Sequence, residues 1–251
     1  MLHSPLFEEQ LRSHLQSRPI LRLLRSYLVV LSLMLIISWP NNPLSHYLQF
    51  SGRPATFQFV FLILFLFAFI LSILPRSIQD QGAYSLIEWI SYTPVGVCAA
   101  YIGRFAFSTC YVLFLIALPS PLIIIAATAT GVPPRRVAAA CVVLLVFCLN
   151  FRTFLLMLQL ILMRRPIIRV LTAGLILLFL LFLSVRLAPI IHPVLVIQGI
   201  LSGTDQISLL NYEREFTWTA TVLIYGLSLG ICIVISITAM KIFKSRLGKP
   251  E

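Results

Sequence analysis

Long stretches without a charged residue constrain this chain more than any other feature of its sequence. Lysine, arginine, aspartate and glutamate are absent from Ser26 to Gly52, from Pro54 to Pro75, from Phe105 to Pro134 and from Phe216 to Met240. A helix needs about 20 apolar residues to cross the hydrocarbon core of a bilayer, so each stretch can hold a span. The chain is 59% hydrophobic and only 11% charged, far from the balance of a soluble domain. The sequence therefore predicts an integral membrane protein.

Further apolar stretches raise the expected number of transmembrane helices to six. Their apolar residues run continuously instead of alternating every second position, which favours helices over the strands of a membrane barrel. We expect an all-α polytopic membrane protein with spans at roughly 22–39, 56–74, 104–126, 137–160, 168–190 and 217–241. The first span follows about 20 residues and is long enough to cross the bilayer, so we expect it to remain in the mature chain.

The basic residues predict that both termini are cytoplasmic, because lysine and arginine favour that side of the membrane. With this orientation 13 of the 19 basic residues are cytoplasmic, namely Arg12, Arg18, Arg22, Arg25, Arg76, Arg104, Arg164, Arg165, Arg169, Lys241, Lys244, Arg246 and Lys249. Arg135 and Arg136 oppose this orientation locally. We interpret the net charge of +11 as a sign of topology and not of nucleic-acid binding.

Two short segments flank the transmembrane domain, which we place at residues 21–243. Residues 1–20 have a possible helix start at Ser4-Pro5 and carry Phe7, Leu11 and Leu15 on one stripe. This pattern predicts an amphipathic helix in the membrane interface, and a solvated, partly ordered tail is the alternative. Residues 244–251 are expected to form a basic cytoplasmic tail.

No motif for catalysis, nucleotide binding or metal binding stands in a context that would support its chemistry. There is no HExxH or GxxxxGK[ST] pattern, and the GxSxG match GLSLG at 226–230 lies inside an expected apolar span and not at the strand-to-helix turn of a nucleophile elbow. Cys98, Cys110, Cys141, Cys148 and Cys232 lack metal-ligand spacing, and the four histidines are scattered along the chain. We expect no catalytic residue, metal or cofactor in this chain, and we expect the cysteines to pack as small apolar residues.

Arg152 is the most unusual residue within an expected span, because an arginine near the bilayer centre costs at least about 2.5 kcal/mol unless it finds a partner or snorkels. Asn150 and Gln159 could supply polar company inside the bundle. One interpretation is a site for an anionic or polar substrate. The other is that the fourth span is tilted and Arg152 snorkels toward the cytoplasmic interface.

The segment from Pro189 to Phe216 contains an apolar run, PVLVIQGIL, that is too short to cross a bilayer. Polar GTDQ and YERE sequences come after it. We expect this outer segment to form a re-entrant or interfacial pair of short helices. The charged residues of this segment fit a solvated rim better than a binding site.

The largest expected cytoplasmic loop lies between the second and third spans. Residues 77–92 could form a short helix along the membrane, and Thr93-Pro94 would end it, because a proline disfavours the helical conformation in the preceding residue. Gly103-Arg104 would then open the third span, with the arginine at the cytoplasmic interface.

The order of these features resembles the permease subunit of type-2 ABC transporters. Glu88, Thr93-Pro94 and Gly103-Arg104 match a family layout of an acidic residue, a Thr-Pro pair and a Gly-basic pair, with arginine in place of the usual lysine. The likeness continues through LPSPLIIIAATATGV at 118–132 and LMRRPIIRVLTAGLILLF at 162–179, and so covers roughly residues 20–245.

The resemblance implies that the loop forms a coupling helix that docks on a separate ABC-type ATPase subunit. ATP and Mg²⁺ would bind to that partner, and Glu88 would lie at or near the contact. A second permease copy or a paralogue would complete a dimer in the cytoplasmic (inner) membrane. The dimer would export or flip a substrate that the sequence does not identify.

Two other functions compete with this one. A membrane scaffold would stabilise a larger complex without transport, and it would copurify with that complex regardless of nucleotide. An ion- or proton-coupled transporter fits less well, because the spans contain few of the acidic residues that couple ions to transport.

Overall fold

The computed structural model describes residues 18–39, 53–79, 96–161, 191–203, 206–209, 212–215 and 218–247, together with helical positions at 172, 174–176, 179 and 182. The elements in chain order are α2 (Arg18–Ile37), α4 (Arg53–Gln79), α6 (Val97–Ala117), α7 (Ser120–Thr130), α8 (Pro134–Ile161), α10 (Pro193–Ser202), β1 (Gln206–Leu209), β2 (Tyr212–Glu215) and α11 (Trp218–Leu247). The described part of the chain is thus helical apart from one small hairpin, which the expectation of an all-α fold did not include.

Four helices in the described part of the chain are long and apolar enough to cross a membrane. They are α2, α6, α8 and α11. In α4 the described apolar stretch, Phe57–Ser72, is shorter, although the helix as a whole has 27 residues. These helices have the character of a multi-pass membrane protein, while the expected count of six spans stays a prediction.

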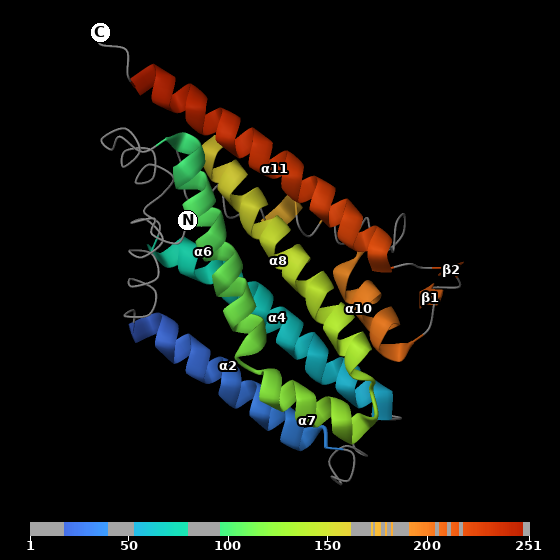
Figure 1. Cartoon of the computed structure of the whole chain (residues 1–251). Coiled ribbons are helices and arrows are strands. Elements are labelled where there is room, and N and C mark those ends of the chain that lie inside the picture. Colours follow the sequence, from blue (N-terminus) through green and yellow to red (C-terminus); the bar gives the residue numbers. More distant parts are fainter. Residues whose placement is uncertain are drawn as a thin grey trace.

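The helices pass back and forth along a common direction (Figure 1). α2 and α4 are antiparallel, because Leu35 near the end of α2 and Phe57 near the start of α4 line one cavity. Val97 at the start of α6, Leu160 at the end of α8 and Met240 near the end of α11 share one hydrophobic cluster. The start of α2 and the ends of α4, α8 and α11 therefore lie at one end of the bundle, here called the terminal end.

The expected third span, 104–126, is two helices in the structure. α6 begins at Val97, seven residues earlier than predicted, and ends before a turn at Leu118 and Pro119, after which α7 begins. Pro119 has no N–H to donate to the carbonyl of Leu115, so an uninterrupted helix would lose a bond there. The hydroxyl of Tyr27 in α2 donates to that carbonyl over 3.1 Å. Proline thus breaks the span, and a side chain from another helix replaces the lost donor.

Aromatic rings link α4, α8 and α11 through the middle of the bundle. The ring centroid of Phe147 in α8 lies 5.5 Å from that of Phe65 and 5.3 Å from that of Phe69, both in α4. On its other side, Phe147 meets Tyr225 of α11 edge to face at 5.5 Å. Such contacts stabilise a helix pair by about 0.5–1.5 kcal/mol beyond the area that they bury.

The expected pair of short helices after Pro189 is one helix and a hairpin. α10 packs its apolar residues against α8, and its C-cap Gly203 has a left-handed φ of 72°. β1 and β2 pair antiparallel, with Gln206 opposite Glu215 and Leu209 opposite Tyr212. The alternation of apolar and polar residues in QISL favours a strand over a second helix.

Several predictions fall outside the described residues. These are residues 1–17 of the amphipathic helix expected at 1–20, residues 80–92 of the loop helix expected at 77–92 with Thr93-Pro94 after it, and nearly all of the fifth span, 168–190. Residues 18–20 belong to α2 and residues 77–79 to α4. At the other end of the chain, α11 continues to Leu247, so the first residues of the expected basic tail are helical.

Candidate functional site

Arg152 lies inside the bundle and faces neither lipid nor the interface. Its side chain is 3% exposed. Nη1 donates a hydrogen bond over 3.0 Å to the carbonyl of Ser72 in α4. The guanidinium carbon lies 5.2 Å from the ring centroid of Tyr111 and 5.9 Å from that of Phe107, both in α6. Carbonyl and aromatic faces offset part of the cost of burying the charge, so snorkelling does not explain Arg152.

Arg104 is also buried, at 4% exposure, and does not open a span at an interface. It lies two turns inside α6, one turn before Phe107 and Ser108. Gly103 beside it is buried as well. The structure therefore corrects the predicted position of the Gly103-Arg104 pair, because residues 97–102 are already helical.

Arg104 and Arg152 belong to a group of buried polar side chains from three helices. We call this group the polar layer, and its members are Ser72, Arg104, Ser108, Arg152 and Thr153. Residues before and after the layer on α6 and α8 belong to two different hydrophobic clusters. The layer thus separates the main core from a smaller core at the terminal end.

Asn150 does not join Arg152, although the sequence suggested that the two side chains could be companions. Residues two positions apart in a helix point about 200° away from each other. Asn150 faces α11, where its Nδ2 donates to the carbonyl of Tyr225 over 2.9 Å and its Oδ1 accepts from the Ser228 hydroxyl over 3.3 Å. These bonds fasten α8 to α11. The side chain of Gln159 is outside the described part.

Tyr225 extends this connection to α10. Its hydroxyl donates to the carbonyl of Ile191, immediately before the α10 N-cap residue His192. The imidazole Nδ1 of His192 accepts from the Leu195 N–H over 3.3 Å, and partial burial lowers the pKa of His192 below its ordinary value of 6.5. Three helices are joined by polar groups at this point.

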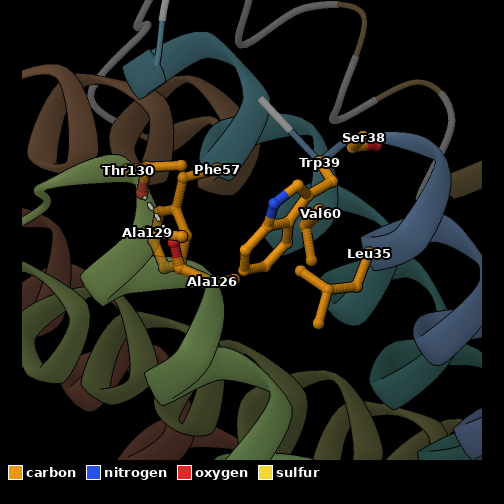
Figure 2. A pocket seen from close by; sticks show the side chains of 8 residues that line it. All are labelled: Leu35, Ser38, Trp39, Phe57, Val60, Ala126, Ala129 and Thr130. Carbon is orange, nitrogen blue, oxygen red and sulfur yellow. Dashed lines mark hydrogen bonds between the residues drawn. The ribbon is translucent and has the colours of Figure 1, made fainter. Parts of the chain in front are cut away.

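A small cavity lies between the end of α2, the start of α4 and α7, far from the polar layer. Figure 2 shows the indole of Trp39 among Leu35, Val60 and Ala126. The cavity volume is about 10 Å³, which is enough for about one water molecule. Pockets for small ligands have volumes of about 300 Å³ or more, so this cavity is not a substrate site.

Three of the predicted coupling residues, Glu88, Thr93 and Pro94, lie outside the described residues. Within the described ranges, no group of three histidine, cysteine or acidic side chains could hold a metal ion. The five cysteines are free thiols. What sequence reasoning missed is the role of Ser72, Phe107 and Tyr111 around Arg152, since only the packing of α4 and α6 on α8 brings them together.

The helical bundle and the polar layer together define a multi-pass membrane protein that buries two arginine side chains, Arg104 and Arg152. No family model, curated protein or solved structure matches the chain.

Proposed function

We propose that the chain is the membrane-spanning permease subunit of an ATP-driven ABC transporter, and that a separate ATPase subunit supplies the energy. The observation that carries this proposal is the position of the two helix ends between which the chain segment with Glu88 and Thr93-Pro94, residues 80–95, is connected. The segment joins the end of α4 to the start of α6, and both of these lie at the terminal end of the bundle.

The charges at the terminal end support a cytoplasmic position for that segment. Arg22 and Arg25 lie in the first turns of α2, and Lys241 and Lys244 lie in the last turns of α11. Basic residues favour the cytoplasmic side of a membrane helix, where an ATPase finds its nucleotide. A docking segment between α4 and α6 would therefore face such a partner.

The described core favours a substrate path at the surface of this chain. Aromatic rings of Phe65, Phe69 and Phe147 pack between α4 and α8, and the cavity at Trp39 has room for only about one water molecule. We propose that the substrate passes between this chain and a second permease copy or a paralogue, with export or flipping as the reaction.

The test is copurification from native membranes in mild detergent, with partners identified by mass spectrometry and ATP hydrolysis measured in the eluate. We expect a stoichiometric ATPase subunit in the wild-type eluate. Glu88→Lys should lower its recovery by about tenfold, because reversing a charge at a docking contact adds repulsion and desolvation cost. The matched control is Glu213→Lys, the same change in the hairpin at the other end of the bundle. If both variants retain the ATPase equally, Glu88 has no part in docking.

The tight packing of the described core also fits a second function, a membrane scaffold for a larger complex. A scaffold needs no interior chamber and no change of conformation. Copurification of a large complex that is indifferent to nucleotide and contains no ATPase would establish the scaffold and contradict the permease.

A further inference from the structure

Pro75 leaves one main-chain carbonyl of α4 without its helical donor. In an α-helix the N–H of each residue donates to the carbonyl four positions earlier, and proline has no N–H. The carbonyl of Leu71 is four positions before Pro75. Because Leu71 is 3% exposed, its carbonyl needs a donor from elsewhere in the protein.

Side chains from two other helices reach α4 at this point. The hydroxyl of Tyr111 in α6 donates to the carbonyl of Leu71 over 3.4 Å. Nη1 of Arg152 in α8 donates to the next carbonyl, that of Ser72, over 3.0 Å. The guanidinium also lies against the Tyr111 ring, so each of the two donors helps to position the other.

The same arrangement of tyrosine, carbonyl and proline occurs at the end of α6. There Tyr27 donates to the carbonyl of Leu115, four positions before Pro119. The two places differ in the course of the chain after the proline. After Pro119 the chain turns into α7, whereas after Pro75 the helix continues to Gln79. Those last residues of α4 are joined to the rest of the helix by one helical hydrogen bond fewer.

We propose that Tyr111 and Arg152 form a latch on α4. The latch holds the end of the helix, residues 73–79, against α6 and α8, and this end opens when the latch releases. Arg152 is then a positioning residue that acts on α4 and not a ligand for a substrate. A helix end with one bond removed and two bonds supplied from outside is a segment of low local stability. The latch does not depend on the proposed transport function.

Hydrogen exchange measured by mass spectrometry on the whole chain in nanodiscs tests the latch. Tyr111→Phe removes one hydroxyl and leaves a buried carbonyl unsatisfied, so amide protection in residues 73–79 should fall by about tenfold. Tyr27→Phe is the matched control, because it removes the same kind of bond at Pro119. It should leave the protection of residues 73–79 unchanged.

Measurements in the Pro75→Ala variant distinguish the latch from a general loosening of the bundle. Pro75→Ala restores an N–H that can donate to the Leu71 carbonyl, so Tyr111→Phe should then change the protection by less than about twofold. An undiminished effect in the Pro75→Ala background overturns the proposal, as does an equal effect of Tyr27→Phe on residues 73–79. Arg152→Lys, which keeps the charge but loses the planar stacking, should also raise exchange there. Unchanged exchange in that variant removes Arg152 from the latch.

Discussion

At the scale of single residues, three tyrosine hydroxyls each satisfy a carbonyl near a proline. Tyr27 and Tyr111 donate to the carbonyls of Leu115 and Leu71, and Tyr225 donates to that of Ile191, two positions before Pro193. Inside a membrane, water cannot replace a donor that proline lacks, so the protein must supply one. Tyr111 and Tyr27 thus supply the donors that Pro75 within α4 and Pro119 after α6 lack, whereas Pro193 is in the first turn of α10, where proline removes no helical bond.

The imidazole of His192 makes the start of α10 sensitive to pH. Neutral Nδ1 accepts from Leu195, and burial lowers the pKa of His192 below 6.5, so the opened state takes up the proton first as the pH falls. The cap therefore contributes its full stability above pH 6.5 and loses it as the pH drops through the lowered pKa. Amide protection at Leu195 should decrease between about pH 7.5 and about pH 5.5.

The control for this pH effect is His192→Asn. Asparagine is a good N-cap residue and does not titrate, so its protection at residue 195, corrected for intrinsic exchange, should stay constant over the same range. If the asparagine variant shows the same pH dependence, a group other than His192 is responsible.

At the scale of elements, α10 is fixed at both ends by polar contacts with its neighbours. Tyr225 and the His192 cap hold its start, while the Arg136 guanidinium of α8 lies where a β-carbon on Gly203 would be. A cation at a helix C-terminus interacts favourably with the helix dipole. This contact is a structural explanation for the position of Arg136, which opposes the orientation that the other basic residues predict.

Substitution of two C-cap glycines separates this contact from backbone strain. Gly131 and Gly203 both have a left-handed φ, 73° and 72°, but a β-carbon on Gly131 would meet no atom within 4 Å. Gly131→Ala should lower the free energy of unfolding in detergent by about 1 kcal/mol. Gly203→Ala should cost about 0.5–1 kcal/mol more, because it also displaces Arg136 from the end of α10.

The excess cost at Gly203 should vanish in an Arg136→Ala background, where no guanidinium is displaced. An equal excess with and without Arg136 would show that the contact contributes nothing. Gly226→Ala provides a baseline, since Gly226 has open space around it and lies within α11.

At the scale of the whole molecule, the start of α2 and the end of α11 lie at the same end of the bundle (Figure 1). If every passage of the chain spans the bilayer, the number of crossings between the start of α2 and the end of α11 is therefore even. The side of the membrane on which this end lies is set by the basic residues.

Cysteine labelling of intact membrane vesicles measures this topology. In a background with all five native cysteines replaced, Arg22→Cys and Lys244→Cys should react with an impermeant thiol reagent from the same side. Arg135→Cys, an exposed position at the start of α8, should react from the opposite side. Labelling of all three positions from one side would contradict the antiparallel directions of α2 and α8.

The sequence by itself determined that this is a membrane protein and where most of its helices lie, because long apolar stretches without charge favour burial in a bilayer. The helices at 18–37, 53–79, 134–161 and 218–247 lie close to the predicted spans. The tertiary structure alone decided how the third span breaks, where Arg104 lies and what Arg152 contacts. Those outcomes depend on donors from other helices, such as Tyr27 for Leu115, and no local pattern shows which distant side chain will replace a bond that proline removes.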